Sequence, residues 1–568
     1  MTATRTGADY FVEALEQYGV EYLFGNPGTT ELPIMESLPD SELEYVMAPH
    51  EDVAVGMAAG YASVRRQRAD EIDGTPAGVV NLHVAPGLAH GLGNLYGAHM
   101  AGAPLVVTAG AHARGFRHEE PILDGDLVTM ADQFTKESRE VLDAAALPTV
   151  LRRAFKTACT PPTGPVFLAL PMDVMAAETD AAVEPLDGPL PNAGRGDPAA
   201  IDRAADALVA AETPVLVLGD NVARHAAWSG VDPVETAVDL AEATGARVHG
   251  EILASEVNFP AEHDQWVSYV PPDEDLARTL LNADTLAFVG CSTNTTLWAH
   301  EGSLVPDRAT VVHVSDDPHE LGKNQPGINV AGDPGLVMAD LAERVGDRLD
   351  AETRAARLDD VAATKEFVAA KMASMAGAET PADEDPRPSK ADVVDAMADI
   401  APDALVVDES VTAKYSLLTR WSFGPDQLLS NKGGGLGYGL SAAVGAALAE
   451  SEREESRTVL GFVGDGSYLY YPHAMYAAAR LGVDLTVVVP DNRQYRILKD
   501  NVASIYGGEV DDHEYVGMDF DPAVDLVANA ESHGASGRVV EERETLGPAI
   551  EAAVDEPGPS LVDVLVRE

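Results

Sequence analysis

Short apolar runs alternate with alanine-rich helical stretches along almost the whole chain, and this alternation constrains the fold more than any other feature of the sequence. Runs typical of buried parallel strands occur at residues 77–82, 104–109, 214–219, 285–290 and 459–463. Strands that alternate with helices in this way predict parallel sheets with helices on both faces. We therefore expect an α/β protein built from doubly wound sheets.

Two segments rich in Asp, Pro and Gly interrupt the alternation. One lies at residues 180–198, and the other follows a charged helix at the end of residues 351–388. Because domains usually hold about 100–200 residues, a chain of 568 residues suits three of them. We expect three doubly wound, parallel-sheet domains at residues 1–180, 195–350 and 388–568.

The chain is strongly acidic, with 38 basic against 93 acidic residues and a formal net charge of −55. A field of this sign repels phosphate backbones and anionic membranes, so we expect neither nucleic acid nor a membrane as a partner. Only 9 of the basic residues are Lys. A carboxylate-rich, Lys-poor surface repels itself in dilute buffer and is screened in concentrated salt. We interpret the composition as halophilic, with an acidic mesophilic protein as the alternative.

Cysteine usage and apolar runs indicate the compartment. Cys159 and Cys291 form neither a CxxC pair nor a disulfide framework, as is typical of a reducing environment. The N-terminal segment lacks the apolar core of a signal peptide, and no apolar run reaches the ~18 residues that span a bilayer. We therefore expect a cytoplasmic protein.

The most informative chemistry follows the predicted strand 459–463, where the sequence continues with residues 464–467 (GDGS). The next predicted strand ends at Asn492, and ligands of open parallel sheets gather at the carboxyl ends of strands. The oxygens of Asp465 and Asn492 suit Mg²⁺, and the flanking glycines let the backbone approach a phosphate. Alternatively, Asp465 is only the N-cap of the next helix, which leaves Asn492 unexplained.

GDGS followed by Asn492, 28 positions after Gly464, resembles the thiamine-diphosphate (ThDP) binding motif of decarboxylases and synthases that act on 2-oxo acids. The resemblance implies that Asp465 and Asn492 ligate Mg²⁺ by their side chains and Gln494 by its backbone carbonyl. The motif usually ends in two asparagines; here the first is Asp491, an extra carboxylate beside the metal. The other residues implied to contact this part of the cofactor are Gly466, Ser467, Tyr495 and Thr412.

Residues 431–439 (NKGGGLGYG) resemble the stretch that holds the aminopyrimidine ring in these enzymes. The resemblance implies that Gly434 offers its carbonyl to the 4′-amino group and that Leu436 presses between the two rings of the cofactor. A glycine-rich turn alone is a weak signal, because such turns open many helices. Beside GDGS and Asn492 it supports the same cofactor.

Glu51 begins an Ala/Gly-rich helical segment within residues 47–62. A glutamate at a helix start is often only a favourable partner of the helix dipole. The surrounding pattern, however, resembles the segment in which ThDP enzymes carry the glutamate that hydrogen-bonds N1′ of the pyrimidine and promotes loss of the C2 proton. In that family the glutamate reaches the cofactor from a neighbouring subunit, so the resemblance implies a homodimer or homotetramer.

Two further stretches resemble the benzoylformate decarboxylase group: residues 24–33 (FGNPGTTELP) and 81–83 (NLH). The resemblance implies that Thr29 binds the substrate carboxylate and that His83 is the acid/base for proton transfers. Without the motif, His83 could equally be a structural histidine at a strand end. The second active-site histidine of that group has no clear counterpart in residues 291–300, and Ile497 predicts a narrower pocket.

These patterns together predict a ThDP- and Mg²⁺-dependent, non-oxidative decarboxylase of a small 2-oxo acid. The resemblance implies addition of the cofactor's C2 carbanion to the keto carbon, loss of CO₂ and protonation of the resulting enamine to an aldehyde. One alternative is an acetolactate synthase-like carboligase, although the middle block shows no convincing GxGxxG for the FAD of that enzyme. Another is a non-catalytic paralogue with the same fold. The identity of the 2-oxo acid stays open.

Overall fold

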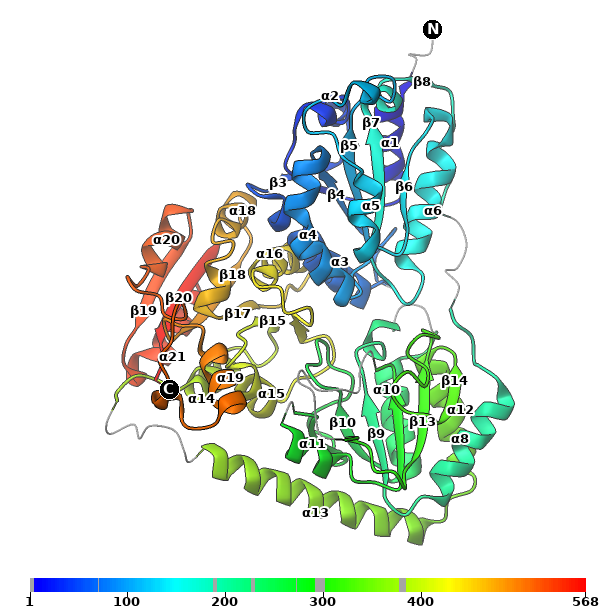
Figure 1. Cartoon of the computed structure of the whole chain (residues 1–568), viewed down its shortest axis with the longest axis vertical. Helices are drawn as coiled ribbons and strands as arrows, with labels where there is room; N and C mark the ends of the chain where they lie inside the picture. The colour runs from blue at the N-terminus through cyan, green and yellow to red at the C-terminus, as the bar shows by residue number, and fades with distance from the viewer. Residues whose placement is uncertain are drawn as a thin grey trace.

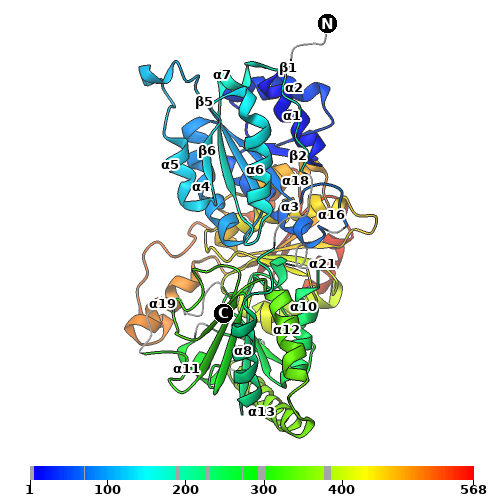
Figure 2. The ribbon, with the colours of Figure 1, turned by 90° about the vertical axis from the view of Figure 1, so that its right-hand side faces the viewer.

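The computed structural model describes residues 5–69, 71–186, 192–225, 230–271, 273–291, 302–376 and 385–567. The described chain forms three six-stranded sheets, each with all of its strands parallel (Figure 1). The expectation of an α/β protein with three parallel-sheet domains is therefore confirmed. Figures 1 and 2 place the N-terminal and middle sheets at opposite ends of the molecule, with the C-terminal sheet against both.

The N-terminal sheet has the strand order β3-β2-β4-β5-β7-β6. Its strands are β2 (Tyr22–Gly25), β3 (Glu44–Met47), β4 (Gly78–Leu82), β5 (Leu105–Ala111), β6 (Ser138–Glu140) and β7 (Val166–Pro171). The helices of this region are α1 (Gly7–Gln17), α2 (Leu32–Ser37), α3 (Glu51–Gln67), α4 (Val84–Met100), α5 (Leu127–Ala131), α6 (Leu147–Cys159) and α7 (Met172–Met175). A small antiparallel pair, β1 (Arg5–Thr6) with β8 (Glu178–Thr179), joins the two ends of this region.

The middle sheet has the order β11-β10-β9-β12-β13-β14, so the direction of winding reverses between β9 and β12. Its strands are β9 (Pro214–Leu218), β10 (Arg247–Gly250), β11 (Trp266–Tyr269), β12 (Thr285–Val289), β13 (Thr310–Ser315) and β14 (Ile328–Ala331). Its helices are α8 (Pro198–Ala210), α10 (Pro233–Thr244), α11 (Glu274–Leu280) and α12 (Pro334–Gly346). The long helix α13 (Ala351–Ala376) then runs beneath this sheet towards the C-terminal one (Figure 1).

The C-terminal sheet has the order β16-β15-β17-β18-β20-β19. Its strands are β15 (Leu405–Glu409), β16 (Leu428–Ser430), β17 (Val459–Val463), β18 (Leu485–Asp491), β19 (Ser536–Val540) and β20 (Pro559–Leu565). Its helices are α14 (Lys390–Ile400), α15 (Lys414–Arg420), α16 (Tyr438–Ser451), α17 (Asp465–Tyr468), α18 (Ala474–Leu481), α19 (Arg496–Tyr506), α20 (Leu526–Ser532) and α21 (Arg543–Val554).

The two outer sheets share one topology. Numbered from its own first strand, each has the order 2-1-3-4-6-5, and the middle sheet does not. Helices α3 and α16 each follow the second strand of their sheet, so they are topological equivalents.

These two helices pack backbone against backbone. A Cβ atom on Gly60 of α3 would collide with the carbonyl of Ala442, and one on Gly445 of α16 would collide with the carbonyl of Met57. One hydrophobic core consequently runs from the N-terminal sheet through both helices into the C-terminal sheet. This contact fixes how the ligand-facing edges of the two outer sheets lie relative to each other.

Among the helices of the described ranges, none combines the length and the apolar character that crossing a membrane requires.

Candidate active site

The predicted catalytic residues of the N-terminal region all lie at the carboxyl-terminal edge of its sheet, where open parallel sheets bind ligands. Thr29 begins a 3₁₀ turn after β2, Glu51 is the first residue of α3 after β3, and His83 is the N-cap of α4 after β4. The structure therefore brings Glu51 and His83 to the same edge of the sheet, after the two strands that flank β2. Gly87 lies between them: a Cβ there would stand 3.0 Å from Glu51 Oε1 and 3.2 Å from His83 Cβ.

A buried carboxylate holds the ring of His83. Its Nδ1 lies 2.7 Å from Glu31 Oε2, and Glu31 is completely buried. Glu31 also accepts hydrogen bonds from the Gly28 backbone N–H (3.0 Å) and the Thr30 hydroxyl (2.6 Å). Since Nδ1 donates to the carboxylate, Nε2 of the neutral ring is left as a proton acceptor.

Two details of this corner escaped the sequence reasoning. Glu31 lies within the quoted FGNPGTTELP stretch, but nothing in the stretch singles it out from the other polar residues. Thr30, and not Thr29, turns its hydroxyl towards His83 Nδ1, at 3.2 Å, while Thr29 is exposed. The exposed position leaves the Thr29 hydroxyl accessible from outside the domain.

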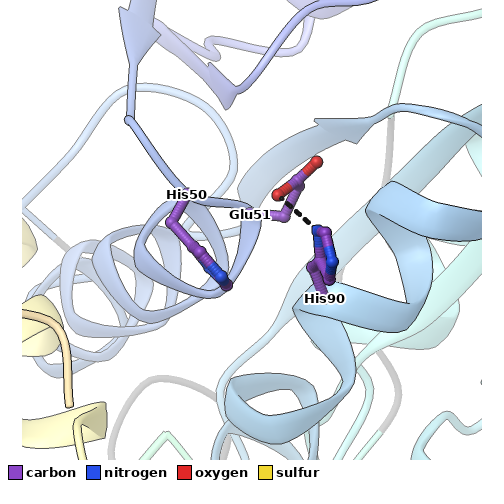
Figure 3. A group of neighbouring side chains, drawn as sticks. All are labelled: His50, Glu51 and His90. Atoms are coloured by element: carbon purple, nitrogen blue, oxygen red, sulfur yellow. Dashed lines mark hydrogen bonds and ion pairs between the residues drawn. The ribbon is translucent and has the colours of Figure 1, made fainter.

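Glu51 has histidine neighbours (Figure 3). His90 of α4 places its Nδ1 3.3 Å from Glu51 Oε2, and the ring of His50 lies beside that of His90, with 5.4 Å between the ring centroids. One potential ligand atom from each of His50, Glu51 and His90 falls within 4.8 Å of the others. However, His50 Nδ1 accepts the backbone N–H of Asp52 (3.1 Å) as a helix cap, which leaves the proton on Nε2 and no lone pair for a metal. The group is therefore a poor cation site: His90 contacts the carboxylate of Glu51, and His50 caps the helix that Glu51 begins.

The start of α3 is braced against the C-terminal domain. Asp52 accepts hydrogen bonds from the backbone N–H of Asn94 (2.9 Å) and from the hydroxyl of Tyr471. Burial raises the pKa of Asp52, and these donors oppose the rise. Glu51 is thus positioned by a contact that crosses between the outer domains.

The predicted diphosphate and metal residues line one pocket at the carboxyl ends of β15, β17 and β18. The lining includes Thr412, Leu436, Asp465, Gly466, Ser467, Asn492, Gln494 and Tyr495, together with Ile497. Gly434 is outside this lining. All of the lining residues belong to the C-terminal domain. Within one chain, the metal pocket and the sheet edge that carries Glu51 are therefore two separate parts of the candidate site.

The donor set at the bottom of this pocket fits a divalent cation. Asp465 is 6% exposed, and its Oδ2 is buried without a hydrogen-bond partner among the described residues. Burial, followed by the nearby carboxylate of Asp491, raises the pKa of Asp465 to about 8. Two buried carboxylates in contact, with an amide oxygen beside them, form the hard oxygen environment that Mg²⁺ prefers.

A second buried carboxylate, Glu409 at the end of β15, organises the glycine-rich segment. It accepts hydrogen bonds from Asn431 Nδ2 (2.7 Å) and from the backbone N–H groups of Gly437 (3.1 Å) and Gly439 (2.9 Å). Burial raises the pKa of Glu409 to about 8. Gly434 adopts φ +71°, a conformation that requires glycine, and its N–H binds Asn431 Oδ1 (3.1 Å).

The other end of this segment is held by the middle domain. Lys432 Nζ lies 2.7 Å from Asp220 Oδ2 and 2.5 Å from Glu251 Oε1, and all three side chains are buried. Asp220 and Glu251 follow β9 and β10, beside the position where the winding of the middle sheet reverses. Lys432 therefore occupies the place where such sheets usually receive a nucleotide.

The ionic network continues into the N-terminal domain. Glu256 accepts from Arg224 Nε (2.9 Å) and from Arg66 Nη2 of α3 (2.6 Å), and these side chains are also buried. The middle domain thus contacts both α3, which begins at Glu51, and the glycine-rich segment 431–439, which contains Lys432.

Three of the seven described non-glycine residues with positive φ lie at the same places. Val84, Val411 and Arg493 have positive φ angles of 39°, 54° and 57°. Each is adjacent in sequence to a predicted site residue, respectively His83, Thr412 and Asn492. Positive φ is rare for non-glycine residues, especially β-branched ones, and it concentrates at functional sites.

The segment expected to carry the replacement for the second histidine lies almost entirely in residues 292–301, outside the described residues. Cys291, which precedes it, is buried with a free thiol.

Comparison with known proteins agrees with this geometry. Family models of thiamine pyrophosphate enzymes match in three parts: the N-terminal TPP binding domain at residues 5–136, the central domain at 201–341 and the C-terminal TPP binding domain at 412–564. The chain therefore belongs to the thiamine pyrophosphate enzyme family. It is a ThDP-dependent enzyme, and enzymes of this family act on small molecules.

Its relatives include both kinds of enzyme expected from the sequence. Benzoylformate decarboxylase of Pseudomonas aeruginosa is 31% identical over 97% of each chain. The catabolic acetolactate synthase of Raoultella terrigena is 27% identical over 99% of this chain and 95% of its own. Among solved structures, the ThDP-dependent 4-hydroxybenzoylformate decarboxylase of Rhodococcus jostii superposes with a TM-score of 0.82, at 28% identity and over 99% of each chain.

Proposed function

We propose that this protein is a ThDP- and Mg²⁺-dependent decarboxylase that converts a 2-oxo acid to an aldehyde. The observation that carries the proposal is the arrangement of His83: a histidine whose Nδ1 is held by a buried glutamate, leaving Nε2 to exchange a proton, stands beside Glu51 at the ligand edge of the sheet. A decarboxylase that releases an aldehyde must deliver a proton to the reacting carbon, and such a histidine can do so. The similarity to benzoylformate decarboxylases supports the same reading.

Each predicted residue has a role in this proposal. When bound, the cofactor supplies the electron sink for loss of CO₂. Glu51 holds a proton at the pyrimidine N1′, His83 Nε2 moves a proton to and from the substrate, and the Thr29 hydroxyl orients the substrate carboxylate. Gly434 and Leu436 position the pyrimidine end of the cofactor.

The metal half of the site binds the other end. Asp465 and Asn492 hold Mg²⁺ through side-chain oxygens and Gln494 through its backbone carbonyl. The residues proposed to contact the diphosphate region are Thr412, Gly466, Ser467 and Tyr495.

The separation of the two halves supports an oligomeric enzyme. Because no N-terminal residue lines the described metal pocket, we place the complete site between subunits of a homodimer or homotetramer. The acidic composition supports a cytoplasm of high salt concentration as its location.

Incubation with a panel of 2-oxo acids tests this function. With ThDP and Mg²⁺ in molar KCl, we expect CO₂ release accompanied by the matching aldehyde. An acyloin as the main product would instead assign the carboligase activity of the acetolactate synthase relatives. Failure of the protein to bind ThDP at all would leave only the non-catalytic alternative.

A further inference from the structure

Three acidic side chains lie on or directly after neighbouring strands behind the metal pocket. Asp465 follows β17, Asp491 ends β18, and Asp563 lies on β20, the other neighbour of β18. Each is buried, with exposed fractions of 6%, 4% and 6%. Burying this much like charge is costly unless something of opposite charge is bound.

The protein itself does not satisfy these carboxylates. Among the described residues, Asp465 Oδ2 and Asp563 Oδ1 are buried without any hydrogen-bond partner. Asp491 Oδ1 accepts the backbone N–H of Arg493 (2.8 Å), but the guanidinium Nε of Arg493 stays 3.8 Å from Oδ2 on a half-exposed side chain. Asp465 and Asp491 are in contact with each other.

We propose that Asp491 turns the metal half of this site into one that binds a divalent cation before any diphosphate is present. The inference rests on the proposed Mg²⁺ site and adds an order of assembly to it. An asparagine, the usual residue of the motif at this position, brings no charge to the ion. With Asp491, two carboxylates already match the double charge of the ion without the cofactor.

The donor set selects the class of ion. Carboxylate and amide oxygens are hard ligands, which suit Mg²⁺, Mn²⁺ and Ca²⁺ better than thiophilic metals. The affinity of such oxygen sites rises with the number of charged ligands. An ion held in this way presents a positive centre to the incoming diphosphate.

The test uses Mn²⁺ and the full-length protein freed of cofactor and metal. Bound Mn²⁺ is counted by electron paramagnetic resonance in molar KCl, which screens weak association with the acidic surface. We expect one Mn²⁺ per chain without ThDP. In Asp491→Asn, the affinity for Mn²⁺ without cofactor should fall by about tenfold or more, because the site loses one of its two carboxylate charges.

Two controls accompany the variant. Asp347→Asn removes one charge at an exposed residue after α12 and should bind Mn²⁺ as the unaltered protein does. Adding ThDP to Asp491→Asn should restore tight Mn²⁺ binding, which also shows that this variant is folded.

Two results would overturn the inference: cofactor-free protein that binds no Mn²⁺ tightly until ThDP is added, or Asp491→Asn with undiminished cofactor-free affinity. The first leaves the proposed enzyme intact. Absence of tight Mn²⁺ binding both with and without ThDP would instead reject the proposed metal site itself.

Discussion

At the scale of single residues, buried carboxylates fix the tautomer or the backbone conformation of the groups around the site. Glu31 fixes the tautomer of His83, and Glu409 holds the turn that contains Gly434. Both act through hydrogen bonds to groups of fixed geometry. Replacing either glutamate by glutamine therefore changes the orientation of the groups that it holds more than it changes the packed volume.

Glu31→Gln tests the role of Glu31. We expect kcat to fall at least about tenfold, because the ring of His83 loses its fixed tautomer. ThDP affinity should stay unchanged, since Glu31 contacts only the histidine corner. Steady-state kinetics and cofactor titration measure both quantities, and an unaltered kcat would contradict the assignment.

Glu51→Gln tests the proposed proton relay to the cofactor. We expect turnover to fall by about a hundredfold or more, because an amide cannot exchange a proton with N1′. Circular dichroism and ThDP binding should show a folded protein that retains its cofactor. Glu44→Gln, the same change at an exposed residue at the start of β3, is the matched control and should keep full activity.

At the scale of secondary-structure elements, sequence patterns predicted many of the strands and missed the contacts between distant elements. The apolar runs at residues 77–82, 104–109, 214–219, 285–290 and 459–463 became β4, β5, β9, β12 and β17, and GDGS follows β17 as expected, whereas short strands such as β3, β10 and β16 were not predicted. Lys432 and Asp220, in contrast, are 212 positions apart, and no local pattern pairs them. Glu31 was likewise invisible, because its importance comes from burial beneath His83 and not from its neighbours in sequence.

The crossing of α3 and α16 gives a prediction at this scale. Gly445→Ala places a methyl group against the carbonyl of Met57 and should destabilise the protein by about 1–3 kcal/mol. Gly547→Ala in α21, where a Cβ would have open space, should stabilise it by about 0.5–1 kcal/mol. Thermal unfolding of both variants measures the difference; equal effects would mean that the close approach is unimportant.

His225, which ends a 3₁₀ turn in the middle domain, links stability to pH. Burial alone would lower its pKa, but the carboxylates of Asp316 (3.0 Å) and Asp333 (3.1 Å) raise it from 6.5 to about 9. The stabilisation is therefore fully present below pH 6.5 and is lost as pH rises through about 9.

The substitution His225→Gln removes this titration. The stability difference between the original protein and the variant should shrink by on the order of 3 kcal/mol across that interval. Chemical denaturation at a series of pH values measures the difference, and a gap that stays constant with pH would contradict the assignment.

At the scale of the whole molecule, net charge and domain contacts act in opposite directions. Repulsion within the formal charge of −55 favours separation of the domains. The buried ion pairs that Lys432 and Arg66 form with the middle domain hold the domains together. Buried pairs are screened by salt far less than surface charges are.

Salt should therefore stabilise this protein. We expect the melting temperature to rise as KCl increases from about 0.1 M to about 1 M, while the Debye length falls from about 10 Å to about 3 Å. An uncharged osmolyte at equal osmolality should have a smaller effect. A melting temperature independent of KCl would remove the halophilic interpretation.

The shared topology of the outer sheets has an evolutionary consequence. Their equivalent helices meet along one seam, which ends in the pair Arg65–Glu452 (2.8 Å), two residues 387 positions apart. Gly60 and Gly445 must stay small because the backbone of the other helix fills the space that a side chain would take. Selection therefore acts on the two helices jointly, as it does on facing surfaces of two proteins that must bind each other.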